Sequence, residues 1–284
     1  MKKITKKFFK FLTGTPDLRS FFKQKKRVLQ RKVYREKYDT LFFLKFIEDL
    51  GIESGDTVFF SSSWDEFYNY SDDIKTLIES LKDFLGEKGN LLMPSNTSFF
   101  ENGHTFDLQK TPTNAGLIAE LFRRFPGVKR SIHLNSSVCI YGPKADFYIK
   151  DHEKSLMAWD TNSPYNKLYE DNAKILTLGC GFFFSMGTPW HCVDSIMYKK
   201  DEKFKEIYDK KIKYRWKNKD EEGNGITLVR KLESKLSYIN KYLTKVPHQN
   251  GKLSNLMGYS VEIKPLVNEG LNLAEKGISL YGKL

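Results

Sequence analysis

The stretch Leu41–Phe60, LFFLKFIEDLGIESGDTVFF, places a helix pattern and a strand pattern on either side of a short turn. Leu41 to Leu50 carries apolar residues at helical spacing and stops at Gly51. Thr57 to Phe60 is an apolar run of strand length. A helix, a turn and a buried strand in this order predict one unit of an α/β fold.

The same alternation continues along the chain and predicts a central mixed sheet flanked by helices. Helices are expected at Ile74–Leu85 and Asn114–Phe125, and strands at Asn90–Met93, Ser137–Tyr141 and Lys174–Leu178. Residues 199–224 depart from the pattern, because they are rich in lysine and acids and poor in aliphatics. They are expected to form a solvated helix or an excursion specific to this protein. No internal repeat or linker divides residues 41–284, which predicts a single catalytic domain.

The positive charge belongs to the N-terminal segment. Residues 1–40 hold 14 lysines and arginines against three acids, whereas the other residues hold 33 against 32. A nearly neutral body argues against nucleic-acid binding. Ile4, Phe8 and Phe11 lie at helical spacing among lysines, which is typical of a helix at an anionic membrane surface. Residues 1–37 are therefore expected to contact the inner face of a membrane or to pack on the domain or on another subunit.

Cysteine and histidine spacing bears on compartment and on metals. Cys139, Cys180 and Cys192 are an odd number without metal-site spacing, which indicates a reduced, cytoplasmic protein. The five histidines show no metal-binding motif, and no apolar run approaches the roughly 20 residues that span a bilayer. We expect no metal and no membrane-spanning helix.

One histidine stands at a predicted helix start. Thr188 and Pro189 suit the cap and the first turn of a helix, so His191 lies where the helix dipole disfavours a charged ring. Asp194 follows three residues later on the same helix face. A neutral histidine beside a carboxylate suits a general base. The alternative from spacing alone is a core histidine that only satisfies its hydrogen bonds.

Six segments in order resemble the antibiotic N-acetyltransferase family, typified by aminoglycoside 3-N-acetyltransferases. The resemblance covers nearly all of residues 41–280. It rests on Leu50–Val58, Leu91–Thr97, Thr111–Gly116, Glu120–His133, Ser163–Tyr169 and Thr188–Asp194. It implies a single-domain enzyme that moves an acetyl group from acetyl-CoA to the amine of an amino sugar.

The resemblance also implies roles for individual residues. His191 would be the general base, and Asp194 stands where the family has glutamate. Ser62 and Ser63 match the loop that lies against coenzyme A, with Ser61 in place of the family's histidine. Further expected positions are Arg130, Ser131 and His133 for coenzyme A, and Ser95, Thr97 and Trp190 for the acceptor.

The acceptor is the open part of this interpretation. Aminoglycosides are polycations, whereas the body is balanced and its tail is basic. We therefore expect an amino sugar on a nucleotide or lipid diphosphate, in surface-polysaccharide synthesis, with aminoglycoside resistance as the alternative. Two hypotheses from other classes remain: a covalent acyl-enzyme on Cys192, and a catalytically silent binding relative. The sequence does not decide the oligomeric state.

Overall fold

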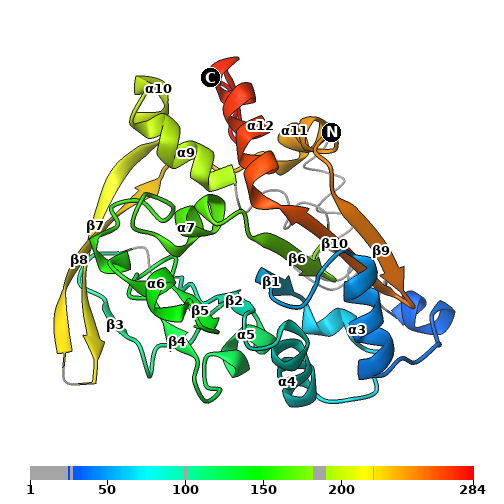
Figure 1. Ribbon diagram of the computed structural model, residues 1–284. Coiled ribbons are helices and arrows are strands. Elements are labelled where there is room, and N and C mark those ends of the chain that lie inside the picture. Colours follow the sequence, from blue (N-terminus) through cyan, green and yellow to red (C-terminus); the bar gives the residue numbers. More distant parts are fainter. Residues whose placement is uncertain (1–24, 26–27, 99–100, 182–189, 220) are drawn as a thin grey trace, which may run out of the picture.

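The computed structural model describes residue 25 and residues 28–98, 101–181, 190–219 and 221–284 (Figure 1). Helices cover both faces of a seven-stranded sheet, and a smaller sheet lies to one side (Figure 1). The predicted α/β class is confirmed. The amphipathic segment Met1–Leu12 and the expected cap at Thr188 and Pro189 lie outside the described residues.

The large sheet is mixed, as expected, with strand order β4-β5-β2-β1-β6-β10-β9. Its central strands β2, β1 and β6 are parallel, and the strands on either side of them run antiparallel to their neighbours. The strands are β1 (Thr57–Ser62), β2 (Asn90–Pro94), β4 (Lys129–Arg130), β5 (Val138–Tyr141), β6 (Lys174–Leu178), β9 (Gln249–Leu253) and β10 (Leu256–Glu262). Parallel strands buried on both faces read as continuous apolar runs, which is why the sequence revealed β1, β2 and β6.

Alternate residues of β1 enter two separate cores. Val58 and Phe60 pack in the core beneath α3 (Thr40–Asp49), α4 (Ile74–Leu85) and α5 (Leu117–Phe122). Phe59 packs in the core on the other face. The helices of that second face are α6 (Ala145–Ile149), α7 (Pro164–Glu170), α9 (Trp190–Tyr198), α10 (Glu202–Lys205), α11 (Leu236–Leu243) and α12 (Ile263–Glu275). Two short 3-10 helices, η1 (Trp64–Glu66) and η2 (His152–Lys154), complete the connections.

The predicted helix Asn114–Phe125 is shorter in the structure. Helix α5 starts at Leu117, after Gly116 at a φ of +112°. Local side-chain bonds hold the preceding residues in a loop, because the Thr113 hydroxyl donates to the carbonyl oxygen of Asn96 at 2.9 Å and accepts from the Ala115 N–H at 3.1 Å. Such bonds compete with the helix for the same backbone groups.

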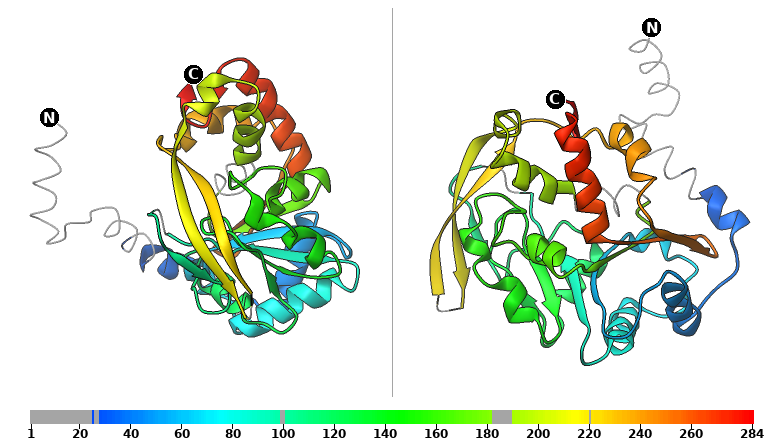
Figure 2. Two further views of the ribbon diagram at one scale, coloured as in Figure 1. Left: turned by 90° about the vertical axis from the view of Figure 1, so that its left-hand side faces the viewer. Right: turned by 45° about the horizontal axis from the view of Figure 1, so that its top comes forward.

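Residues 199–224 hold the short helix α10 and most of a long hairpin, rather than one solvated helix. Strands β7 (Tyr208–Asn218) and β8 (Glu221–Arg230) pair antiparallel, and β3 (Thr105–Asp107) joins β7 (Figure 2). The physical reason is that buried and exposed residues alternate along β7, a period of two that is typical of a strand. Ile212 and Tyr214 are buried, while Lys211, Lys213 and Arg215, which alternate with them, are exposed.

The chain ends in a small two-stranded turn, β11 (Ile278–Ser279) and β12 (Gly282–Lys283), which follows α12. No helix within the described residues has the length and apolarity needed to cross a membrane.

Candidate active site

The site forms where α9 begins. Aromatic rings link it to the central sheet, since Trp159 lies 5.4 Å from the His191 ring and stacks on Tyr165 at 3.6 Å. Tyr165 meets Phe59 of β1 edge to face, with ring centroids 5.4 Å apart. These ring contacts connect His191 to the hydrophobic core, and 19% of its side chain stays exposed.

His191 and Asp194 form the predicted pair. The Nδ1 atom of His191 lies 3.0 Å from Oδ2 of Asp194, whose side chain is fully buried. An ionised carboxylate only accepts hydrogen bonds, so the ring proton of the neutral imidazole belongs on Nδ1. The Nε2 lone pair is then free to accept a proton. The structure thus brings together the two residues that the helix spacing predicted.

Two tyrosines from distant parts of the chain hold the carboxylate of Asp194. The hydroxyl of Tyr281, in the turn between β11 and β12, donates to Oδ2 at 2.7 Å. The hydroxyl of Tyr208, at the start of β7, donates to the same atom at 3.1 Å. Three groups therefore converge on one oxygen, while Oδ1 is buried without a hydrogen-bond partner among the described residues. This arrangement fixes the rotamer of Asp194 and, through it, the ring of His191.

Arg230, the last residue of β8, lies against the imidazole. Its Nη1 atom is 3.0 Å from Nε2 and 3.3 Å from Nδ1 of His191. A donor on the Nε2 lone-pair axis would lie on the far side of the ring from Nδ1. The near-equal distances therefore put the guanidinium across the ring, beside the lone-pair direction rather than on it. A cation sits next to the base without occupying its proton-accepting position.

Burial is the main reason that the pKa of His191 lies below its ordinary value. The hydrogen bond from Asp194 opposes this effect, and the charge of Arg230 adds to it. Low dielectric and a neighbouring cation both disfavour imidazolium. The ring is consequently neutral at pH 7, as a general base requires.

Cys192 is unsuited to covalent catalysis. Its thiol is fully buried and lies 3.7 Å from the carbonyl oxygen of Tyr165. Burial, with the charge of Asp194, raises the pKa of the thiol far above its ordinary value. A thiol without a thiolate fraction is a poor nucleophile.

Ser62 and Ser63 lie at the carboxyl end of β1, next to the end of β6. Ser62 is opposite Leu178 in the parallel pair, and the Ser63 N–H donates to the Leu178 carbonyl at 3.1 Å. Gly179 follows at a φ of +70°, and a side chain there would strike Glu66 at 2.7 Å. Loops at the carboxyl ends of parallel strands are the usual place for a ligand in α/β proteins. Their contact with coenzyme A stays a prediction.

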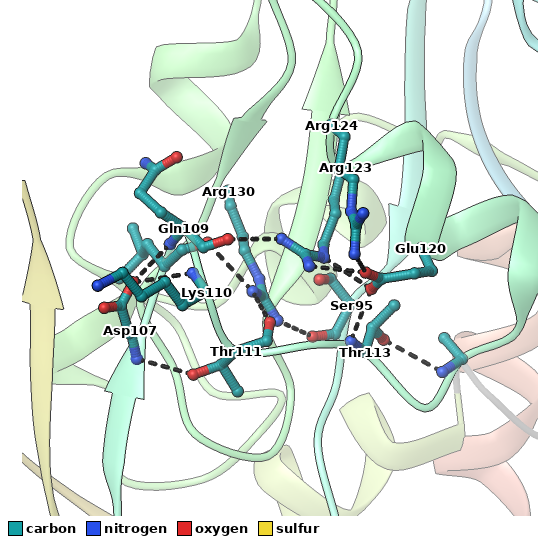
Figure 3. Close-up of polar contacts among 12 residues, drawn as sticks. Ser95, Asp107, Gln109, Lys110, Thr111, Thr113, Glu120, Arg123, Arg124 and Arg130 are labelled. Carbon is teal, nitrogen blue, oxygen red and sulfur yellow. Dashed lines mark hydrogen bonds and ion pairs between the residues drawn. The ribbon is translucent and has the colours of Figure 1, made fainter.

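The guanidinium of Arg130 is hydrogen-bonded to other groups of the protein (Figure 3). Its guanidinium donates to the carbonyl oxygens of Leu108, Thr111 and Ser95 at 3.2, 2.6 and 2.9 Å, and to the hydroxyl of Ser137 at 3.1 Å. Burial lowers its pKa to about 10. In this conformation Arg130 fastens the loop before α5 to the sheet, so its predicted contact with a coenzyme A phosphate would require these bonds to be exchanged.

The neighbouring Glu120 joins two arginines in the same region (Figure 3). Arg123 and Arg124 lie 2.6 and 2.5 Å from its carboxylate. Burial acts to raise the pKa of Glu120, but the hydrogen bonds from Arg123 and from the Thr113 backbone outweigh it and bring the pKa to about 2. Arg123 is buried, whereas Arg124 is exposed.

Ser131 and His133 belong to a fully buried polar cluster. The rings of His133 and His152 stack with centroids 4.8 Å apart. Nδ1 of His133 meets the Ser136 hydroxyl at 2.7 Å, and Nδ1 of His152 meets the Ser131 hydroxyl at 2.8 Å. Burial lowers the pKa of His133 to about 4 and that of His152 well below its ordinary value. Both rings are thus neutral, and the cluster stabilises the loops between β4 and α7.

The three residues expected at the acceptor are buried. Thr97 donates to the Leu134 carbonyl at 2.6 Å, and the Ser95 hydroxyl has no hydrogen-bond partner among the described residues. Trp190 is fully buried and packs against Gly270 of α12. Direct contact of these side chains with an acceptor remains a prediction.

The sequence did not reveal Tyr208, Arg230 and Tyr281. Tyr281 meets Asp194 across 87 positions of the chain, and Arg230 meets His191 across 39. No local spacing predicts such contacts, because they depend on where the hairpin and the final turn fold back.

The comparisons agree on one family. The family model for aminoglycoside 3-N-acetyltransferases matches residues 59–274. The SPbeta prophage-derived aminoglycoside N(3′)-acetyltransferase-like protein YokD of Bacillus subtilis (strain 168) is 28% identical over 158 residues, which are 48% of this chain and 58% of that protein. Aminoglycoside N(3)-acetyltransferase IV of Salmonella sp is 31% identical over 135 residues, 47% of this chain and 50% of that protein. The match thus spans about half the length of these relatives.

Two solved structures share the fold. The apoenzyme of aminoglycoside acetyltransferase AAC(3)-IVa has a TM-score of 0.70 at 20% identity, covering 86% of this chain and 91% of that one. The AAC-IIIb binary complex with CoASH has a TM-score of 0.67 at 19% identity, covering 82% and 94%. Likeness at this identity establishes a common fold.

Proposed function

Because the chain belongs to the aminoglycoside 3-N-acetyltransferase family, we propose that it transfers an acetyl group from acetyl-CoA to an amine of an amino sugar. The observation that carries the proposal is the contact between Nδ1 of His191 and Oδ2 of Asp194 at 3.0 Å. It directs the basic Nε2 atom away from its partner, where an acceptor amine would present its proton.

The reaction needs little beyond alignment and a base, since a thioester is already activated. The amine nitrogen attacks the acetyl carbonyl carbon, the C–N bond forms, and the C–S bond breaks. The amine proton passes to Nε2 of His191, and the sulfur leaves as the thiolate of coenzyme A. The proton on the imidazole then returns to the thiolate or to water. Asp194 stabilises the transient imidazolium, and the two tyrosines keep its carboxylate in place.

The tetrahedral intermediate also requires hydrogen-bond donors for its oxyanion. We propose the backbone N–H groups of Ser61–Ser63 or of Gly179–Gly181 for this role. Both loops follow adjacent parallel strands and are fixed to each other by the Ser63 N–H. The predicted coenzyme A contacts of Ser62 and Ser63 belong to the same region.

Aminoglycosides are the acceptors to test first, because the relatives are named for them. The experiment measures coenzyme A release from acetyl-CoA with aminoglycosides, with simple amino sugars and with nucleotide-linked amino sugars. Acceptor-dependent release of coenzyme A supports the proposal. Acetyl-CoA binding by calorimetry without release in any mixture would contradict it and favour a silent binding relative. A role in surface-polysaccharide synthesis stays a prediction, tested by the nucleotide-linked members of the panel.

For residues 1–37 we propose peripheral contact with an anionic membrane. The support is sequence alone: a basic segment with phenylalanines at helical spacing. The test compares the full chain with a chain lacking residues 1–37 in sedimentation with anionic liposomes. Equal binding by both chains would refute the proposal, and a change in oligomeric state on deletion would favour packing on another subunit.

A further inference from the structure

One face of the β7–β8 hairpin carries a row of cations that ends at the catalytic histidine. In antiparallel strands, directly paired residues share a face, and residues two apart stay on it. Tyr208 pairs with Arg230, Lys211 with Leu228, and Lys213 with Ile226. Further along, Arg215 pairs with Asn224 and Lys217 with Glu222. We define the cationic face by the residues Arg230, Lys211, Lys213, Arg215 and Lys217.

The opposite face of the hairpin packs on the protein along β7, and Leu228 on the cationic face is buried as well. Ile212 and Tyr214 are buried there with Phe106 and Leu134. A side chain at Gly225 would strike the Tyr214 ring at 2.3 Å, which places that ring on the inner face. The five residues of the cationic face are all exposed. They are therefore available to a ligand rather than used to hold the hairpin down.

The row is connected to the base at its inner end. Tyr208 donates to Asp194, and Arg230 contacts the ring of His191. The next cation, Lys211, lies on the neighbouring strand, diagonally across from Arg230, and such neighbours are about 7–8 Å apart. A register shift between Tyr208 and Lys210 keeps Lys211 on the same face as Tyr208.

Few anions balance these charges. On this face of β7 and β8, among the described side chains, the carboxylate is that of Glu222, which lies 3.8 Å from Lys217 at the far end. Residues 41–284 as a whole carry nearly equal numbers of bases and acids, so the row is a local concentration and not a reflection of overall charge. Cations that line an approach attract anionic ligands and repel cationic ones.

The reaction itself favours an anion beside Arg230. When Nε2 of His191 takes the amine proton, an imidazolium forms against a guanidinium at 3.0 Å. Two like charges at this distance oppose the step. An anionic group that binds the guanidinium would neutralise it, or draw it off the ring, as the proton arrives.

We propose that the acceptor is an amino sugar that carries a phosphate group, which Arg230 and Lys211 bind while its amine faces Nε2 of His191. The proposal rests on the proposed acetyl transfer and names its substrate class. A longer anionic part, such as a diphosphate, would continue along Lys213 and Arg215. Arg230 is then a specificity-determining residue, because a polycation would have to approach against this row.

The experiment compares kcat/KM for acceptors that differ in charge. Glucosamine and glucosamine 6-phosphate share the amine and differ by one phosphate, and an aminoglycoside supplies the polycation. The enzymes are the wild type, Arg230→Gln and the double variant Lys211→Gln, Lys213→Gln. The control is Lys75→Gln with Lys88→Gln, at α4 and the turn after it, beneath the other face of the sheet.

We expect the phosphorylated sugar to exceed glucosamine by about tenfold in kcat/KM, the effect of one charge-assisted contact. Both hairpin variants should remove most of this preference by raising KM for the phosphorylated sugar. The readout is the ratio of kcat/KM for the two sugars within each enzyme, because the charge of Arg230 also acts on the pKa of His191. The control variant should keep the wild-type ratio. The preference should also weaken as salt is raised.

Two results would overturn the inference. In one, the aminoglycoside or glucosamine is the best acceptor and the hairpin variants do not alter the order. In the other, the variants raise KM for acetyl-CoA but not for the acceptor, and acetyl-dephospho-CoA abolishes that change, which would assign the row to coenzyme A. Absence of coenzyme A release with every acceptor is a different outcome, because it refutes the proposed acetyl transfer itself.

Discussion

Replacing Tyr281 by phenylalanine tests how the active-site carboxylate is held. The substitution removes one hydroxyl that donates to Oδ2 of Asp194 at 2.7 Å and keeps the ring, which is almost fully buried. Tyr208 and His191 remain on the same oxygen at 3.1 and 3.0 Å. The carboxylate therefore stays partly satisfied, and the change isolates a single donor.

The expected shift in the pKa of His191 follows from the hydrogen bond that Tyr281→Phe removes. A hydrogen bond to a charged group contributes about 1.5–3 kcal/mol, and the remaining donors suggest the lower end of that range. Loss of the donor concentrates negative charge beside His191, which stabilises imidazolium and raises the pKa of the ring. Since one pH unit corresponds to about 1.4 kcal/mol, we expect a rise of up to roughly one unit.

The assay is the pH dependence of kcat/KM. In the proposed mechanism activity needs the neutral ring of His191, so a raised pKa moves the acidic limb of the profile to higher pH. The acceptor amine titrates identically in both enzymes and does not contribute to the difference. Tyr169→Phe is the matched control, because it removes a hydroxyl that donates to Asn268 on the surface, at 2.9 Å. An acidic limb that stays in place for Tyr281→Phe would refute the role assigned to Tyr281.

Three further outcomes are expected. Cys192→Ser should keep turnover within about twofold, since the buried thiol takes no part in the chemistry; a large loss in coenzyme A release would revive the acyl-enzyme hypothesis. The free energy of unfolding should fall as pH drops from 6.5 towards 4, because the folded state keeps His133 and His152 neutral while the unfolded chain takes up protons. By linkage His133 alone contributes on the order of 3 kcal/mol, and His152 acts in the same direction. Urea titrations that give a flat profile over this range would contradict the assignment. Gly270→Ala should destabilise the protein by about 1–3 kcal/mol, because the new Cβ would lie 2.5 Å from the side chain of Val193. Thermal unfolding measures this effect, and an unchanged Tm would show that α9 and α12 adjust freely.

The sequence predicted those helices and strands whose apolar pattern is visible within a few neighbouring residues. Strand β6 and helix α4 follow the expected bounds, since an apolar run and a 3.6-residue period are visible within a few residues. The hairpin escaped prediction, although Ile212, Tyr214 and Trp216 alternate with cations at a period of two. Its many lysines and acids suggested a solvated segment because only one face of each strand is covered.

The same distinction applies to the site. His191 and Asp194 are three residues apart on one helix, so helical geometry alone brought them together. Arg130 carries the charge that suits a phosphate, but the structure shows its donors bound to backbone carbonyls. Residue type indicated what Arg130 can bind, whereas only the fold shows which partners it has. Arg230 illustrates the reverse case, an exposed cation that the fold carries to the base.

The central claim is that Nε2 of His191 removes the proton from the acceptor amine. The most direct measurement is coenzyme A release by His191→Ala with the best acceptor, alongside Tm and acetyl-CoA affinity to show that fold and coenzyme binding persist. We expect turnover to fall by roughly 10²–10⁴ with both controls unchanged. Turnover close to that of the wild type would contradict the account.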